Sequence, residues 1–372
     1  MTMVQNVTYV KAVGIVLMVI AHSHCGIPYV FQVIYMFHMP LFFFCSGYCF
    51  KPKYYKEPHI FVWRRVKGIW WPYVKWSLLF LLLHNIFYYV GFYNYLSGDN
   101  WNHTFALPEI QSHAHSILLD MEGHEQLLGG FWFMKALFYG ALIGFATLLT
   151  AHLMSIVTAR LLGEISKKHV IYGLYSIICG SVVLLVACWL NSRNDTLTRL
   201  MLTPKEFLSA VFFVVGHVFA YTKASKFRLW SGLLSFAVVV VGSFFWWMEM
   251  ASSFFDNSKM LPYTVTAILG TWTVFSLPWH RVKGKARTLL SYIGNHTLTI
   301  LTWHFVFFKM VSYVIVLIYG LQLTRLSEMP VIAEYAQKGW WLIYSVAGIS
   351  VPLLLNFILS KLPAAIQLMQ RS

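Results

Sequence analysis

The chain has 372 residues, of which 58% are hydrophobic and only 11% are charged. A water-soluble fold of this length could not keep so much apolar material off its surface, so the composition argues strongly against a soluble globular enzyme. Lys and Arg exceed Asp and Glu by 15. In a membrane protein such an excess indicates cytoplasmic loop charge, so we expect no nucleic-acid partner.

Ten apolar windows predict transmembrane helices, because each is about long enough to cross the hydrocarbon layer at roughly 18 to 25 residues. The first window has no basic leader and is expected to be a retained span rather than a signal peptide. We predict an all-α integral membrane protein, a single domain over residues 1–372. The windows cover residues 8–26, 28–50, 69–92, 131–153, 170–190, 206–222, 229–249, 261–279, 291–319 and 339–360.

The number of Lys and Arg residues alternates between high and low from one loop to the next. If the N-terminus lies inside, the loops over 51–68, 160–168, 223–228 and 281–287, with the tail after 360, hold 18 Lys and Arg. The opposite loops hold six. Because Lys and Arg are retained in the cytoplasm, this bias predicts that both termini are cytoplasmic.

One long connection, about residues 93–130, carries five acidic residues and four histidines but no Lys or Arg. We expect it to face outward and to cover an external polar substrate, since binding segments often lie on long loops. His113 and His115 do not have the spacing of a closed tetrahedral metal site, and we expect no metal.

Two ionisable residues in the first window are predicted to share one helix face. Lys11 and His22 are eleven residues apart, which on a helix is three turns plus roughly 20° and about 16 Å of rise. Lys11 is then near the cytoplasmic surface and His22 lies in the outer half. Their separation suits a long ligand, and ionisable groups at such depth are functional candidates.

Four further segments have the same order as motifs of a known family. They are Phe37 to Tyr48 (FHMPLFFFCSGY), the basic stretch from Arg64 to Tyr73 (RRVKGIWWPY), residues 131–137 (FWFMKAL) and residues 293–304. With them the chain resembles the membrane-bound acyltransferase-3 family, and within it the O-acetyltransferases of bacterial surface polysaccharides, described as fucose 4-O-acetylase-like. Lys11 and His22 match the family's basic residue, ten-residue gap and histidine. The chain departs from the pattern at Gly68, where another Arg is common, and at His296, where Ser is common.

The resemblance implies transfer of an acetyl group from cytoplasmic acetyl-CoA, a co-substrate, to a sugar hydroxyl of a surface polysaccharide or its lipid-linked precursor. The expected location is the bacterial inner membrane. A hydroxyl needs a proton acceptor during attack, and a histidine of near-neutral pKa suits that role. His22 is therefore the expected general base. His38 is expected in the pocket, orienting His22 or donating to the developing oxyanion.

The remaining site residues follow from the needs of the two substrates. The phosphates of CoA require cations at the cytoplasmic side, and Arg offers a planar fork for phosphate oxygens. We expect Lys11, Arg64, Arg65 and Lys67 to bind CoA, and Ser46 and Trp132 to border the substrate pocket. The resemblance adds His304 to this pocket, because it matches a histidine of the family. Next to Ser46, Gly47 is expected to be a small-residue packing contact between helices.

Three alternatives remain open at this stage. Buried ionisable residues and ten spans also suit a glycan transporter or flippase. The same fold could use succinyl-CoA or another acyl donor, and it could be a nonenzymatic membrane partner. The expected partners are the saccharide acceptor and membrane lipid. The sequence does not separate direct transfer from an acyl-histidine intermediate, and it indicates no oligomeric state.

Overall fold

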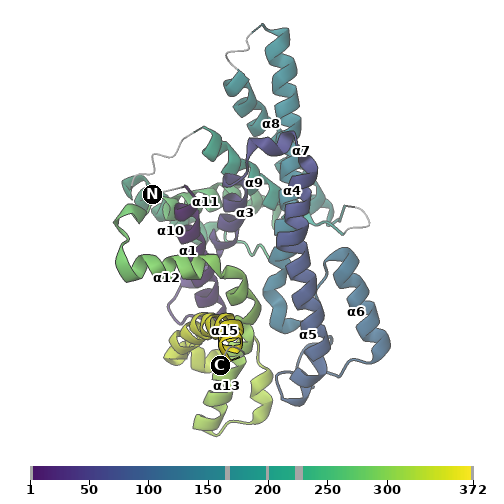
Figure 1. Ribbon diagram of the computed structural model, residues 1–372, viewed down its shortest axis with the longest axis vertical. Coiled ribbons are helices and arrows are strands. Elements are labelled where there is room, and N and C mark those ends of the chain that lie inside the picture. Colours follow the sequence, from purple (N-terminus) through teal and green to yellow (C-terminus); the bar gives the residue numbers. More distant parts are fainter. Residues whose placement is uncertain (1–2, 164–167, 198–200, 223–228, 370–372) are drawn as a thin grey trace.

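The structure is a computed structural model that describes residues 3–163, 168–197, 201–222 and 229–369. These residues form helices and no β-strand (Figure 1). The α-helices are α1 (Met3–His22), α2 (Val30–Tyr35), α3 (His38–Tyr48), α4 (Pro58–Arg65), α5 (Trp71–Tyr89), α6 (Leu107–Asp120), α7 (Trp132–Leu161), α8 (Lys168–Arg193), α9 (Pro204–Tyr221), α10 (Leu229–Phe245), α11 (Asn257–Phe275), α12 (Gly284–Asn295), α13 (Thr297–Tyr319), α14 (Ala333–Tyr335) and α15 (Trp341–Met369). Short 3-10 or π-helical turns include η1 (Pro52–Tyr55), η2 (Val66–Trp70), η3 (Gln126–Phe131), η5 (Trp279–Arg281), η6 (Leu323–Ser327) and η7 (Ala336–Trp340).

Each of the ten apolar windows contains a helix, which confirms an all-α multi-pass membrane protein. Among the described residues, seven helical segments are long and apolar enough to cross a membrane, namely α1, α2 with α3, η3 with α7, α8, α11 with η5, α13, and α14 with η7 and α15. The windows at 69–92, 206–222 and 229–249 correspond to α5, α9 and the shorter apolar α10. The count of ten crossings and the cytoplasmic termini stay predictions. The basic loop over 223–228 and part of the loop over 160–168 lie outside the described residues.

Two windows are interrupted at positions that matter for the site. The second window is divided between α2 and α3, because Phe37 has a non-helical backbone (φ −146°, ψ −14°). His38 is therefore the first residue of α3, and Pro40 lies in its first turn, where a missing N–H removes no helical hydrogen bond. The ninth window is divided at His296, whose Nδ1 donates to the Tyr292 carbonyl at the end of α12 (2.8 Å).

Glycines bring α3 and α9 into close contact. A Cβ atom on Gly47 would lie 1.8 Å from the Phe213 carbonyl oxygen, and one on Gly216 would lie 2.1 Å from the Phe44 carbonyl oxygen. Only glycine allows the two backbones to approach this closely, as at other small-residue helix interfaces in membranes. The expected packing role of Gly47 is confirmed. α3 thereby packs against α9, while α1 packs against α3, α12, α13 and α15.

A separate aromatic cluster fixes the short helix α4 and so the basic residues at its end. Phe61 of α4 is buried with residues of α7 and α9, including Phe145 and Phe213. The Phe61 and Phe145 rings stack with centroids 4.7 Å apart. Because Phe61 is one turn before Arg65, this packing determines which basic side chain of the pair Arg64 and Arg65 faces the protein interior.

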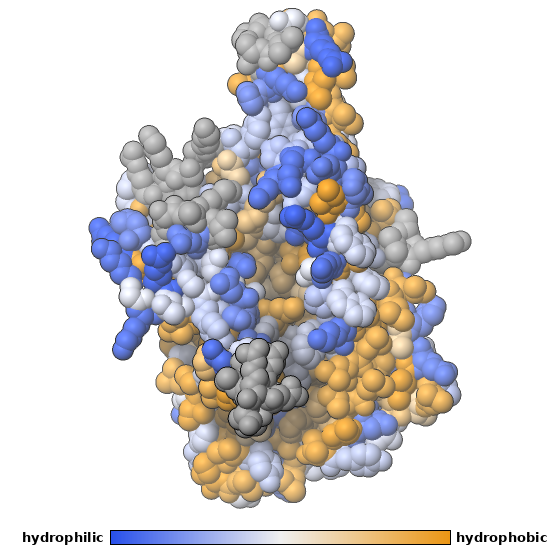
Figure 2. Space-filling model, viewed as in Figure 1, coloured by the Kyte–Doolittle hydropathy of each residue, from blue (hydrophilic) through white to orange (hydrophobic). Residues whose placement is uncertain are grey.

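The surface is that of a protein embedded in lipid. Large aliphatic side chains stand outward on several long helices, for example Leu82, Leu185, Leu317 and Leu359, each more than 60% exposed. Water would not tolerate so much exposed apolar area, whereas lipid does. Figure 2 shows one face hollowed near its middle, with hydrophobic residues on the floor and hydrophilic residues around the rim. In Figure 1 the α7–α8 hairpin projects at one end of the long axis, and α6 lies beside α5.

Candidate active site

Two histidines from distant parts of the chain are in direct contact. His22 is the last residue of α1 and His304 lies within α13. His22 Nδ1 is 3.1 Å from His304 Nε2, and the two rings stack with centroids 5.3 Å apart. Phe305 lies against the His22 ring, with centroids 5.0 Å apart. The structure thus brings His304 to the general base predicted from the sequence.

The hydrogen bonds assign the tautomers of this pair. His304 Nδ1 faces the carbonyl oxygens of Leu301 (2.9 Å) and Ile300 (3.1 Å), so it carries the proton and donates. In a neutral imidazole the other nitrogen is then an acceptor. His304 Nε2 therefore accepts from His22 Nδ1–H. The remaining nitrogen of His22, Nε2, keeps its lone pair, and no described residue forms a hydrogen bond with it.

His38 is held in a similar way on the neighbouring helix. Its Nδ1 donates to the Ile34 carbonyl across the break between α2 and α3 (2.9 Å). In the neutral ring Nε2 is an acceptor, so it can accept from a substrate hydroxyl. Donation to an oxyanion from Nε2 would require a protonated ring.

His22 and His38 border a large cavity, which we call the outer cavity. Its volume is about 620 Å³, within the size range of small-molecule sites. It is bordered by α1, by the segment Met121–Trp132, and by the loops before α9 and α11. Trp132 borders this cavity, and so do Trp101 and Glu122 of the long connection over residues 93–130. That the connection covers an external substrate stays a prediction.

The outer cavity contains acidic and basic side chains that the sequence argument did not assign. Lys135 forms an ion pair with Glu122 (Nζ to Oε1, 3.0 Å). Lys205 donates to the Ala251 carbonyl (3.0 Å) and lies over the Trp132 ring, 5.6 Å from its centroid. Glu206 caps the start of α9 through Thr203. In the sequence, Lys135 could be noticed as a lysine within an apolar window, and Glu122 as one of the acidic residues of the long connection over residues 93–130.

Buried polar contacts fasten the outer connection to α5. His84 Nε2 donates to the His103 carbonyl (3.0 Å), and His84 Nδ1 is hydrogen-bonded to Glu125 (2.9 Å). Asn85 exchanges hydrogen bonds with the backbone of Phe105. Burial raises the pKa of Glu125, while hydrogen bonds from His84 and Tyr93 oppose that shift. These contacts make the segment beside the cavity a fixed wall rather than a free loop.

A second cavity, which we call the inner cavity, contains the predicted cations. Its volume is about 320 Å³, and Lys11, Ser46 and Arg65 border it. The Arg65 guanidinium lies over the Phe61 ring, 4.8 Å from the centroid, and its buried Nε has no hydrogen-bond partner among the described residues. Lys11 and Arg65 therefore lie around the same space.

Other predicted residues lie elsewhere. Arg64 is exposed and donates to the Tyr54 hydroxyl (2.9 Å), and Lys67 is exposed. Neither residue borders the inner cavity. Ser46 is at the inner cavity rather than beside Trp132, and its buried hydroxyl has no partner among the described residues. His304 borders neither cavity and reaches the outer one only through His22. Gly68 borders the inner cavity, and a Cβ atom there would meet nothing within 4 Å.

Within the described part of the chain, no three or more His, Cys, Asp or Glu side chains gather in a metal-binding arrangement. The five cysteines are free thiols.

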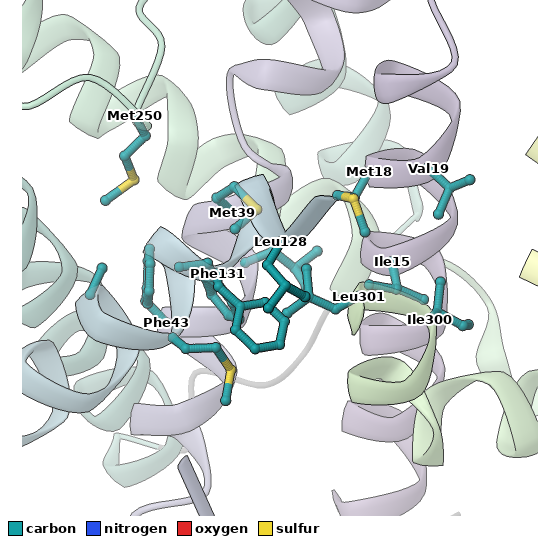
Figure 3. Close-up of a cluster of buried hydrophobic side chains, with 14 of the residues drawn as sticks. Ile15, Met18, Val19, Met39, Phe43, Leu128, Phe131, Met250, Ile300 and Leu301 are labelled. Carbon is teal, nitrogen blue, oxygen red and sulfur yellow. The ribbon is translucent and has the colours of Figure 1, made fainter. Parts of the chain in front are cut away.

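The inner and outer cavities adjoin at the side chains of Met18, Met39 and Leu301, which border both. Figure 3 shows these three side chains close together, with Leu128 and Phe131 beside them. The two cavities therefore connect Lys11 and Arg65 with His22, except where these apolar side chains separate one cavity from the other.

A comparison with protein families gives one match, to the acyltransferase domain of the acyltransferase-3 family over residues 4–360. Neither the curated proteins nor the solved structures gave a match.

Proposed function

The chain belongs to the acyltransferase-3 family and is an O-acyltransferase, and we propose that it moves an acetyl group from cytoplasmic acetyl-CoA to a sugar hydroxyl. The proposed acceptor is a cell-surface polysaccharide or its lipid-linked precursor, and the proposed location is the bacterial inner membrane. One observation carries the proposal: His22 borders one cavity, the cations Lys11 and Arg65 border another, and the two cavities adjoin inside one helix bundle.

The histidine pair supports general base catalysis. His22 Nε2 takes the proton of the sugar hydroxyl as the hydroxyl oxygen attacks the thioester carbonyl carbon. The C–S bond then breaks, and the CoA thiolate takes the proton back from His22. His304 accepts from His22 Nδ1–H throughout, so it holds the ring orientation and stabilises the imidazolium. His22 is the catalytic residue in this proposal, and His304 is a positioning residue.

The inner cavity fits an anionic, elongated donor. Lys11 and Arg65 border it, and neither forms an ion pair with a described residue. The Arg65 Nε–H is a buried donor without a partner, and such donors are costly unless a ligand satisfies them. The phosphates of CoA would supply acceptors there, and the thin pantetheine arm would extend along α1 toward His22.

The outer cavity fits a saccharide. Trp101 and Trp132 offer aromatic faces for sugar rings, and Glu122, Lys135 and Glu249 offer hydrogen-bonding groups. Its volume of about 620 Å³ is sufficient for a short saccharide segment. An acceptor placed here would present its hydroxyl to His22 Nε2 without crossing the apolar side chains that separate the cavities.

The function is tested with the purified protein in lipid nanodiscs. Acetyl-CoA and a glycolipid fraction from the producing cells are added, and the release of free CoA thiol is followed together with the mass of the glycan. We expect thiol release that depends on the acceptor and an acetyl ester on the glycan. Thiol release without acetylated glycan, or glycan movement without thiol release, would refute the proposal. The second result would favour a transporter.

A further inference from the structure

Of the described residues, three border both cavities: Met18 of α1, Met39 of α3 and Leu301 of α13. We call these three side chains the junction. They are 2%, 6% and 6% exposed, and none has a group that donates or accepts a conventional hydrogen bond. Any group that passes from the cations to His22 must therefore leave water and displace closely packed apolar atoms.

The junction is built into the same helix turns as the histidines. Met18 precedes His22 by one turn on α1, and Leu301 precedes His304 by three residues on α13. Met39 follows His38 at the start of α3. Residues three or four apart share a helix face. The junction thus lies directly beneath the histidines on their cytoplasmic side, if α1 is oriented as the loop charges predict.

The segment η3 fixes one side of the junction. A Cβ atom on Gly130 would approach the Leu301 Cδ1 atom to 3.0 Å, so the glycine lets η3 pack directly against Leu301. Leu128 and Phe131 of the same segment lie beside the junction in Figure 3. With η3 packed against Leu301, the junction has little room to widen on that side.

Resting on the proposed function, we propose that the junction selects the acyl donor, admitting a neutral, unbranched acyl group and rejecting charged or branched ones. The donor enters from the inner cavity, so its acyl group reaches the junction ahead of the sulfur atom and the pantetheine arm. An unbranched acyl chain is no wider than that arm and can follow the same path. A branched chain is wider and must push packed side chains aside, which closely packed interiors resist.

Charge is rejected for a different reason. A carboxylate at the end of the acyl group would lose its hydration among two thioethers and an isobutyl group, with no partner at that depth. Burying an unpaired ion is among the costliest changes in a protein interior. The lysines on the far side do not offset this cost at the junction, since Lys135 is already paired with Glu122 (3.0 Å).

Matched donors test each form of selection in the wild-type protein. Butyryl-CoA and succinyl-CoA have four-carbon acyl groups that differ by a terminal carboxylate, and butyryl-CoA and isobutyryl-CoA differ only by a branch. We expect kcat/KM about 100-fold lower for succinyl-CoA than for butyryl-CoA, and about 10-fold lower for isobutyryl-CoA. Values for succinyl-CoA and butyryl-CoA that agree within about threefold overturn the proposal.

Variants then assign the selection to the junction. Met39→Gln introduces an amide of nearly the same size and should raise the succinyl-to-butyryl ratio of kcat/KM by about 10-fold. Met18→Ala should raise the isobutyryl-to-butyryl ratio by a similar factor. Each ratio is measured on one preparation, so it does not depend on the fraction of folded protein. If both variants are active with unchanged ratios, the junction is not the selector.

Met260 supplies the matched control, because it is a fully buried methionine of α11 that borders neither cavity. Met260→Gln and Met260→Ala should leave both ratios unchanged, and a change equal to that of the junction variants would overturn the assignment. The wild-type ratios decide the proposal even if a variant fails to fold. A protein that transfers acetyl but accepts succinyl as readily as butyryl overturns the junction proposal and leaves the proposed function standing. A protein that transfers none of these acyl groups overturns both.

Discussion

The two cavities hold their charges differently. In the outer cavity Lys135 is paired with Glu122 and Lys205 donates to a backbone carbonyl, so both lysines have partners within the protein. In the inner cavity Lys11 and Arg65 have no acidic partner among the described residues. A cation without a partner can bind an anion without first breaking an ion pair. This contrast supports the proposal that the inner cavity receives the anionic substrate, while the outer cavity recognises a neutral or mixed-charge one.

The largest effect expected from this contrast is at His22. His22→Ala should lower kcat by about 10² to 10⁴-fold, because the proton acceptor is lost while both binding cavities remain. Free CoA thiol release and glycan acetylation measure the effect, and membrane insertion should be unchanged. His296→Ala is the control, since His296 borders neither cavity and donates to a backbone carbonyl. Acetylation at the wild-type level by His22→Ala would remove the catalytic role from the outer cavity.

His304 should come next. His304→Leu removes the acceptor for His22 Nδ1–H and should lower kcat by about 10 to 100-fold, with KM for both substrates within about twofold of wild type. His304→Gln places an amide oxygen near the same position and should recover part of the loss. The split between kcat and KM, and the recovery with Gln, separate a positioning role from simple packing. Equal losses in both variants, accompanied by raised KM, would indicate packing alone.

Arg65 probes the inner cavity, with its neighbours as controls. Arg65→Ala should raise the KM for acetyl-CoA about 10-fold and leave kcat nearly unchanged, since a charge-assisted hydrogen bond to phosphate is worth about 1.4 kcal/mol or more. Arg64→Ala and Lys67→Ala should each change this KM by less than about threefold, because both residues are exposed and neither borders the cavity. Initial rates over a range of acetyl-CoA concentrations measure all three. Equal effects at the three positions would show that general surface charge, rather than the inner cavity, attracts the donor.

The smallest expected effect is tighter binding of acetyl-CoA on substitution of Gly68. Gly68 faces the inner cavity with open space around it, so Gly68→Arg should add a third cation and lower the KM for acetyl-CoA by about threefold. Gly68→Met has a side chain of similar reach without charge and should leave this KM unchanged. Equal changes in the two variants would mean that volume, rather than charge, matters at this position.

Much of the fold could be predicted because its main signal is local. A run of apolar residues long enough to cross lipid identifies a helix without knowledge of its neighbours, and all ten windows contain one. The breaks at Phe37 and His296 could not be predicted in this way. Each depends on a backbone geometry and a histidine-to-carbonyl bond that a run of apolar residues does not reveal.

In the candidate site, too, relations within one helix could be predicted from the sequence, whereas contacts between distant segments could not. Lys11 and His22 lie on one helix, so helix geometry was sufficient to relate them. The contact between His22 and His304 joins residues 282 positions apart, and only the family resemblance pointed to His304. Arg64 and Arg65 are identical in chemistry and adjacent in sequence. The packing of Phe61 against α7 turns one toward the cavity and the other toward solvent, and this orientation is a tertiary property.

Leu301 takes part in both the histidine contact and the junction. Its carbonyl oxygen accepts a hydrogen bond from His304 Nδ1, while its side chain helps to separate the cavities. A bulky acyl group that tilts this turn of α13 would therefore also disturb the hydrogen bond that determines which nitrogen of His22 is unprotonated. Under the proposed mechanism, an acyl group that fits poorly would then also weaken the proton acceptor, so donor selection and reactivity would be coupled through one turn of α13.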